Sequence, residues 1–263
     1  MLRLEILIIR FGSNFINRVL QRQPLHTPSI TQVTLPNLRR FAFLGTATYL
    51  DGLVDRISAP SLSSLSVDLY GETPVTVPHL LHFLQSSENL RFNAVKIAFS
   101  ALYSVHLSAG TPRFPCLELH ILCSLLYGQT ASAANILSAL SPVLSVVKKV
   151  TLTSNAIDRY PAGRGDFAYR SQWRELLRPF THVKAINVQG NYFDKAFHSL
   201  LPAEGEPPLE LLPNLEEVRY SGGLDAPSRD ALNAFIYARR VAGHLVSLHM
   251  VEFPCSPMTQ TRT

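Results

Sequence analysis

One spacing of apolar residues recurs along the chain: an apolar residue, a second three positions later, and a third two positions after that. In LPNLRRFAF these are Leu38, Phe41 and Phe43. The spacing returns in SLSSLSV, VKKVTL, VKAINV and LEEVRY, and looser copies begin at Leu4, Phe92, Phe114 and Leu245. The first and last copies imply a mean period of about 30 residues, which lies in the range of solenoid repeats. The copies therefore predict a strand that is repeated along the chain.

The segments between these strands show a helical period, in which apolar residues fall at positions i, i+3, i+4 and i+7. Leu50, Leu53, Val54 and Ile57 have this spacing, and Thr48 stands where its side chain can cap the helix. Further helices are predicted over 78–90, 132–146, 169–178, 193–201 and 228–242, the last closed by Gly243. Strand and helix therefore alternate along most of the chain.

The middle of the chain breaks this alternation, because no convincing helix separates its strands. Strands are predicted over 92–103, 105–108 and 114–126, the first two able to pair as a hairpin. Gly110 and Pro112 supply turn signals before the third strand.

Parallel strands joined by helices stack as a right-handed coil. We therefore expect an α/β fold, a leucine-rich-repeat-like right-handed solenoid with a parallel concave sheet and helices on the convex side. This degenerate repeat domain is expected to occupy residues 1–253. Residues 254–263 lack an apolar pattern, which predicts a disordered tail. Residues 154–166 lack periodicity and contain Pro and Gly, which predicts a mobile loop.

Five phrases of the chain resemble the repeat region of fungal F-box proteins: LPNLRRFAF, YLDGLVDRISAPSLSSLSV, VPHLLHFLQSSENLRFNAVKIAFS, WRELLRPFTHVKAINV and LELLPNLEEVRYSG. The resemblance covers most of the chain, and its phrases mark strands rather than a binding site. In that family a degenerate leucine-rich-repeat domain follows an F-box, which docks on the adaptor of a cullin-RING ubiquitin ligase. The implied role is to hold a target protein for ubiquitination. Nothing ahead of Leu4 matches an F-box, so we expect no binding of the F-box adaptor by this chain alone.

Composition excludes several classes of protein. The chain has 263 residues, of which 46% are apolar and 16% charged, so it is long and apolar enough to fold. It contains no uninterrupted run of 18 apolar residues, and no membrane span is expected. Three cysteines are too few for a disulfide framework and lack zinc-site spacing. They indicate a reducing, intracellular location, in the cytoplasm or nucleus.

No recognisable catalytic or cofactor motif occurs in the sequence. Phosphate-binding glycine loops, the nucleophile elbow and the HExxH zinc signature are all missing. His79 and His82 lie three positions apart on a predicted helix, without further metal ligands nearby. No metal-binding residues are therefore expected. We therefore expect a non-enzymatic protein with no catalytic residue and no cofactor. A hydrolase with a dispersed triad is an alternative that no motif supports.

A nucleic-acid-binding solenoid is the other alternative, since 24 Lys and Arg outnumber 19 Asp and Glu and leave a formal charge of +5. Phosphate backbones are bound by clustered basic residues. Here the basic residues form the isolated pairs Arg39-Arg40, Lys148-Lys149 and Arg239-Arg240, without interleaved aromatics. Solvated surfaces are the better interpretation, and a target protein of unknown identity is the expected partner.

The repeat geometry also predicts where that partner binds. Residues between the last two apolar positions of each strand point away from the helices, because side chains alternate along a strand. They form one column on the concave face, namely Ala42, Ser66, Lys96, Glu118, Thr151, Asn187, Arg219 and His249. Two positions earlier lie Arg40, Ser64, Lys149, Ala185 and Glu217. The candidate partner-binding residues are Arg40, Lys96, Glu118, Lys149, Asn187, Arg219 and His249.

Overall fold

The computed structural model describes residues 3–11, 32–70, 74–100, 104–111, 114–123, 127–154, 166–190, 194–202, 206–207, 209–222 and 226–251. Ten strands form its central sheet: β1 (Ile6–Arg10), β3 (Arg40–Gly45), β5 (Ser64–Tyr70), β6 (Ala94–Ser100), β7 (Ser104–Gly110), β8 (Pro115–Leu122), β9 (Lys149–Ser154), β10 (Ala185–Gln189), β11 (Glu217–Ser221) and β12 (Ser247–Val251). The short strands β2 (Val33–Thr34) and β4 (Ile57–Ser58) pair separately.

The strand order is β1-β3-β5-β8-β7-β6-β9-β10-β11-β12. Neighbouring strands of the sheet run parallel except where β7 pairs with β6 and β8. The expected α/β fold with a mostly parallel sheet is therefore confirmed. The predicted tail 254–263 and nearly all of the predicted loop 154–166 lie outside the described residues.

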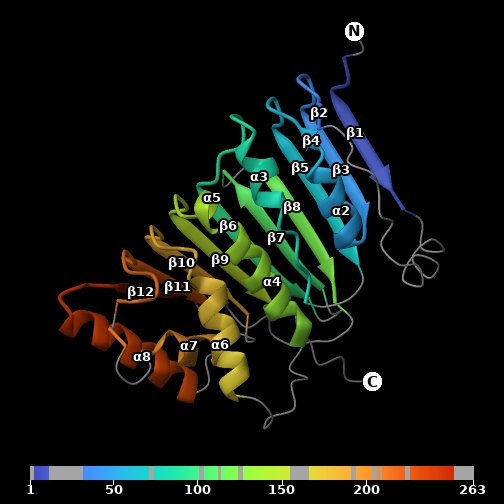
Figure 1. Cartoon of the computed structure of the whole chain (residues 1–263). Helices are drawn as coiled ribbons and strands as arrows, with labels where there is room; N and C mark the ends of the chain where they lie inside the picture. Colours follow the sequence, from blue (N-terminus) through green and yellow to red (C-terminus); the bar gives the residue numbers. More distant parts are fainter. Residues whose placement is uncertain are drawn as a thin grey trace, which may run out of the picture.

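Helices cover one face of this sheet (Figure 1). Their bounds are α2 (Ala47–Val54), α3 (Leu80–Gln85), α4 (Tyr127–Ala139), α5 (Ser141–Leu144), α6 (Asp166–Leu177), α7 (Asp194–Leu200) and α8 (Ala226–Val241). The core lies between the helices and the sheet. The strands alternate accordingly: Leu65, Val67 and Leu69 of β5 are at most 1% exposed, while the residues between them are only partly buried.

Strands β6, β7 and β8 form an antiparallel meander, which confirms the predicted hairpin but not a regular coil. In a coil of successive repeats β5 would pair with β6. Instead, β5 pairs with β8, and β6 pairs with β9 on the far side of the meander. The turn from β7 to β8 needs Gly110, because a Cβ there would lie 2.7 Å from the backbone N of Cys116. The strand order therefore runs backwards through this segment.

Several helix ends differ from the prediction. Thr48 lies inside α2, and its N-cap is Thr46, which makes no side-chain capping bond. Helix α3 is shorter than 78–90 because it ends at Gln85. The helix expected over 132–146 is split between α4 and α5, with a proline in the first turn of α5. The positive φ of 84° at Gly243 confirms the predicted end of α8.

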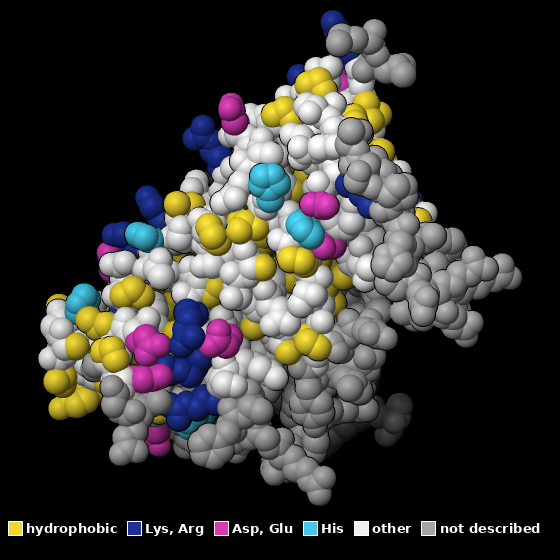
Figure 2. Space-filling model, viewed as in Figure 1, with side chains coloured by type: hydrophobic (Ala, Val, Ile, Leu, Met, Phe, Trp, Pro, Cys, Tyr) yellow, Lys and Arg dark blue, Asp and Glu magenta, His cyan; other side chains and the backbone are white. Residues whose placement is uncertain are grey.

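Asp51 of α2 binds the start of α3 rather than stabilising its own helix. Its carboxylate accepts a hydrogen bond from the backbone N–H of His79 at 2.8 Å and lies 2.7 Å from Nδ1 of the same residue. This hydrogen bond raises the pKa of His79, assisted by the charges of Asp51 and Asp55 and opposed by desolvation. The ring of His79 is therefore part of a helix-to-helix contact. Figure 2 shows charged and histidine side chains on the surface of the molecule, viewed as in Figure 1.

We expect His79→Gln to destabilise the protein more at pH 5.5 than at pH 8. Because folding raises the pKa of His79, its stabilising contribution is complete below the unfolded value of 6.5 and is lost as the pH rises through the folded value. The side chain is 49% exposed, so the effect is limited to a few tenths of a kcal/mol. Urea denaturation at both pH values measures it. An equal cost at the two pH values would contradict the assignment.

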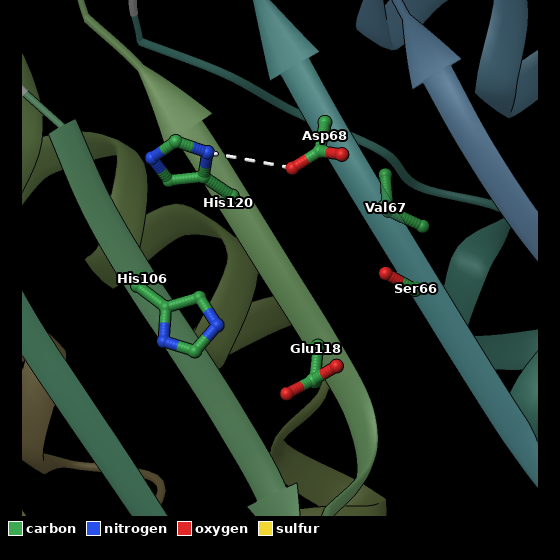
Figure 3. A pocket seen from close by; sticks show the side chains of 6 residues that line it. All are labelled: Ser66, Val67, Asp68, His106, Glu118 and His120. Carbon is green, nitrogen blue, oxygen red and sulfur yellow. Dashed lines mark ion pairs between the residues drawn. The ribbon is translucent and has the colours of Figure 1, made fainter. Parts of the chain in front are cut away.

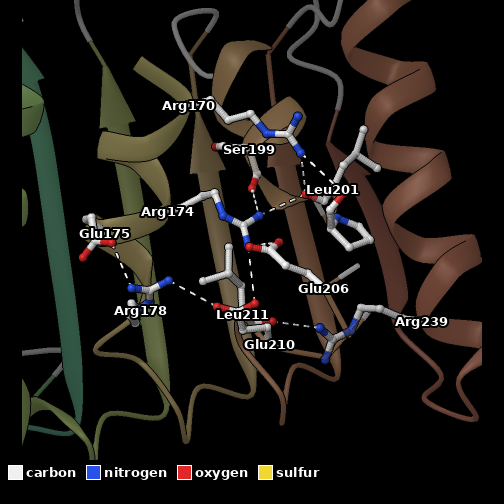
Figure 4. A network of polar contacts seen from close by, with 11 residues as sticks. Arg170, Arg174, Glu175, Arg178, Ser199, Leu201, Glu206, Glu210, Leu211 and Arg239 are labelled. Atoms are coloured by element: carbon white, nitrogen blue, oxygen red, sulfur yellow. Dashed lines mark hydrogen bonds and ion pairs between the residues drawn. The ribbon is translucent and has the colours of Figure 1, made fainter. Parts of the chain in front are cut away.

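Two buried arginines fasten the segment between α7 and β11. Arg174 donates hydrogen bonds to the carbonyls of Ser199 and Leu201 and pairs with Glu206 (Figure 4). Arg239, with no exposed surface, donates to the carbonyls of Leu211 (3.0 Å), Leu212 (2.7 Å) and Pro213 (3.0 Å). The interpretation of the pair 239–240 as solvated is thus wrong for Arg239. Its buried guanidinium supplies hydrogen-bond donors to backbone carbonyls of an irregular segment.

Candidate functional site

The sheet face opposite the helices, here called the open face, carries one row of side chains in register across all ten strands. In sheet order this central row is Ile8, Ala42, Ser66, Glu118, Ser108, Lys96, Thr151, Asn187, Arg219 and His249. All eight residues of the predicted column lie in it. The meander changes their order, because Glu118 follows Ser66 and Lys96 precedes Thr151, and it adds Ser108.

The residues of the second predicted row are aligned in two separate parts of the sheet. Arg40 pairs with Ser64, while Lys149, Ala185 and Glu217 are successive neighbours on β9, β10 and β11. The three strands of the meander lie between these two parts. The candidate residues therefore share one face, but Arg40 and Ser64 lie on a different part of the sheet from Lys149, Ala185 and Glu217.

The basic residues at the C-terminal end of the open face are internally paired. Glu217 Oε1 accepts a hydrogen bond from Arg219 Nε at 2.6 Å and lies 3.4 Å from His249 Nε2. The Arg219 hydrogen bond lowers the pKa of Glu217. This end of the face thus presents a neutralised group of charges, whereas Lys96 and Lys149 carry the positive charge nearer the middle.

A pocket of about 350 Å³ opens near the middle of the central row. It lies over β5, β8 and β7 (Figure 3) and is lined by Ser66, Val67, Asp68, His106, Glu118 and His120. Asp68 Oδ1 is 3.4 Å from His120 Nδ1, and the rings of His120 and His106 are 6.3 Å apart between centroids. Carboxylates and imidazoles from three strands therefore share one hollow.

The two histidines face each other because β7 and β8 run antiparallel with His106 opposite His120. Burial lowers the pKa of His106, and the positive charges of His120 and Lys96 lower it further, while Glu118 and Asp68 raise it. The net effect is a lower pKa, so His106 is a neutral imidazole at neutral pH.

Sequence reasoning identified Ser66 and Glu118 but missed Asp68, His106 and His120. Asp68 and His120 lie two positions beyond Ser66 and Glu118, so the alternation of strand side chains was a signal for both. His106 could be found only from the antiparallel register of the meander. The pocket therefore depends on the part of the topology that departs from the repeat.

The pocket does not have the geometry of a metal centre or a nucleophile. Within the described residues, no group of three or more His, Cys, Asp and Glu side chains is arranged to hold a metal ion. Nucleophilic catalysis needs a hydroxyl within hydrogen-bond reach of its base. In the described part of the chain, the contacts of these imidazoles are the ion-pair contact of His120 with Asp68 and the ring contact between His106 and His120. The arrangement is suited to binding charged or hydrogen-bonding groups.

The two described cysteines do not supply an activated thiol. Burial raises the pKa of both Cys116 and Cys123, which favours the protonated thiol. A reactive cysteine needs a lowered pKa. Both residues therefore act as packing groups of β8 and its end.

The described helices include none that is both long and apolar enough to cross a membrane. Comparisons of the chain with protein-family models, with curated proteins and with solved structures gave no match.

Proposed function

We propose that this chain is a non-enzymatic scaffold whose open face binds a target protein. The supporting observation is the central row, which runs in register through ten strands on the face that the helices leave uncovered. At about 4.8 Å per strand, this row extends over roughly 40 Å. Such a length matches the dimension of a protein interface of standard size better than that of a small-molecule site.

The chemistry of the face favours a protein over a nucleic acid. A phosphate backbone requires several neighbouring unpaired basic residues. Along the central row Glu118 is separated from Lys96 only by Ser108, and Arg219 is already bonded to Glu217. Mixed charges among small polar residues are typical of the polar parts of protein interfaces.

A more specific proposal for the fold and the kind of protein rests on the repeated apolar spacing and on the resemblance to fungal F-box proteins. We propose a degenerate leucine-rich-repeat-like solenoid, similar to the substrate-recognition part of an F-box subunit of a cullin-RING ubiquitin ligase. The bound target would accordingly be presented for ubiquitination in the cytoplasm or nucleus. The alternation of strands and covering helices supports the solenoid, and the meander is an interruption within it.

Charge reversal on the open face should weaken partner binding without unfolding the protein. We expect Lys96→Glu, Lys149→Glu and Arg219→Glu together to weaken binding by at least about tenfold, while surface substitutions change stability by less than about 0.5 kcal/mol each. A photo-crosslinking residue at Thr151 captures the partner in cell extract, and quantitative mass spectrometry measures the yield.

Arg240→Glu is the matched control, since Arg240 is an exposed arginine near the end of α8. It should leave the crosslinking yield at Thr151 unchanged. The proposal fails if the open-face reversals leave the crosslinking yield unchanged, or if the change at Arg240 lowers it as much as they do.

A further inference from the structure

The pocket on β5, β8 and β7 is the point of the open face where negative charge is concentrated. Asp68 and Glu118 contribute one carboxylate each, from neighbouring strands. In the described part of the chain, Glu118 forms no ion pair or hydrogen bond through its side chain, and Asp68 has only the 3.4 Å contact with His120. Two carboxylates on a solvent-facing surface are thus available to a ligand.

The surrounding groups do not cancel this charge at neutral pH. His106 is neutral, because burial is the largest influence on its pKa and lowers it. Lys96 lies two strands away from Glu118 along the central row, with Ser108 between them. The pocket therefore favours a cation over an anion.

The shape of the pocket identifies the type of cation. Its volume of about 350 Å³ admits an extended side chain, and its walls combine carboxylates with the flat rings of two histidines. A guanidinium binds carboxylates through a planar fork of N–H donors and stacks on flat rings, whereas an ammonium is a compact, strongly hydrated charge. A metal ion is unsuited, since the described side chains do not form a metal-binding group.

We propose that this pocket receives an arginine side chain of the target protein, held by Asp68 and Glu118 and flanked by the rings of His106 and His120. This inference rests on the proposed function, because it takes the open face to be the binding surface. It adds the chemical identity of the anchor: a partner segment carrying an accessible arginine.

The same geometry makes the pocket sensitive to acid. The charged and titratable groups facing His106 are Glu118, His120, Lys96 and Asp68. As the pH falls below the lowered pKa of His106, its imidazole gains a proton and a positive charge, which repels a guanidinium. Arginine binding is therefore stronger at neutral pH, where His106 is neutral, than in acid.

The test uses two peptides that differ only in charge, acetyl-Gly-Arg-Gly-amide and the same peptide with citrulline in place of arginine. Binding to the full chain is followed by NMR through the imidazole resonances of His106 and His120. At pH 7.5 we expect saturable shifts with the arginine peptide and none with the citrulline peptide. Asp68→Asn and Glu118→Gln should each weaken binding about tenfold, as expected for removal of a charge-assisted hydrogen bond.

On acidification the arginine peptide should bind more weakly, and His106→Asn should reduce this dependence on pH. Equal binding of the citrulline peptide, or unchanged affinity in both carboxylate variants, overturns the inference. The comparison of the two peptides on the unaltered chain needs no variant to fold.

Failure of this inference can be told apart from failure of the proposed function. If neither peptide binds while the reversals at Lys96, Lys149 and Arg219 still weaken crosslinking at Thr151, the arginine pocket is wrong and the interaction face stands. If the arginine peptide binds at the pocket but the reversals do not change crosslinking, the pocket stands and the wider interaction face is wrong.

Discussion

Replacing Arg239 by Met is expected to lower the free energy of unfolding by about 3 kcal/mol. The substitution keeps an apolar stem but removes the guanidinium donors to the carbonyls of Leu211, Leu212 and Pro213. Each buried acceptor left without a donor costs about 1–3 kcal/mol. Burial disfavours the charged form and lowers the pKa of Arg239, so removing the charge offsets part of this cost.

The backbone beneath Arg239 adds to the expected loss. Leu212 has a φ of 53°, in the left-handed region that non-glycine residues adopt only when surrounding contacts hold them there. Arg239 supplies such a contact through its hydrogen bond to the Leu212 carbonyl. The segment should therefore loosen when the guanidinium is removed.

Arg240→Met is the matched comparison, because Arg240 is the exposed neighbour on the same helix. Its substitution should change stability by less than about 0.5 kcal/mol. Urea denaturation followed by the fluorescence of Trp173, the single tryptophan and a fully buried one, measures both variants. Similar midpoints for the two variants would show that Arg239 does not hold this segment.

Gly190→Ala is expected to destabilise the protein by about 2 kcal/mol or more. Gly190 follows β10 with a φ of 103°, a conformation that side chains disfavour, and an added Cβ would lie 2.5 Å from the carbonyl oxygen of Ser154. Its N–H also donates to the Ser221 carbonyl, so the residue cannot move away without losing a bond. The clash is with backbone, which has little room to adjust.

Gly52→Ala provides the control and should have the opposite sign. Gly52 lies within α2, and a Cβ there would meet nothing within 4 Å. Alanine at such a helical position stabilises by about 0.5–1 kcal/mol through its higher helix propensity. Thermal and urea denaturation of the two variants would separate the effects. A neutral result at Gly190 would mean that the ends of β9 and β10 are not held together as described.

The repeated spacing predicted most of the strand framework because it records which residues face the core. It placed Leu38, Phe41 and Phe43 inside, and all three are at most 2% exposed. It also placed Ala42 and its counterparts in one row, since alternation follows directly from strand geometry. To predict the alignment of this row across the sheet, it was enough to align each copy of the spacing with its neighbour.

The remainder depended on contacts that leave little trace in local sequence. The antiparallel meander pairs β8 with β5 and β6 with β9, and a hairpin signal does not say on which side its strands return. The role of Arg239 was hidden for a similar reason: an arginine near a helix end suits the helix dipole equally well. The pocket lined by His106 and His120 could not be predicted either, because these residues meet only once the meander has folded.

The meander also has a consequence for the protein during its synthesis. Strand β5 leaves the ribosome before α3, β6 and β7. It pairs with β3 on one side, but its neighbour on the other side is β8, which is made after all of them. In a regular coil each new repeat would cover the edge of the one before it. Here one edge of β5 stays unpaired until the whole meander has been translated. An unpaired strand edge can form hydrogen bonds with strands of other chains. Chaperones that act on nascent chains should therefore matter most for this protein while that one stretch is being made.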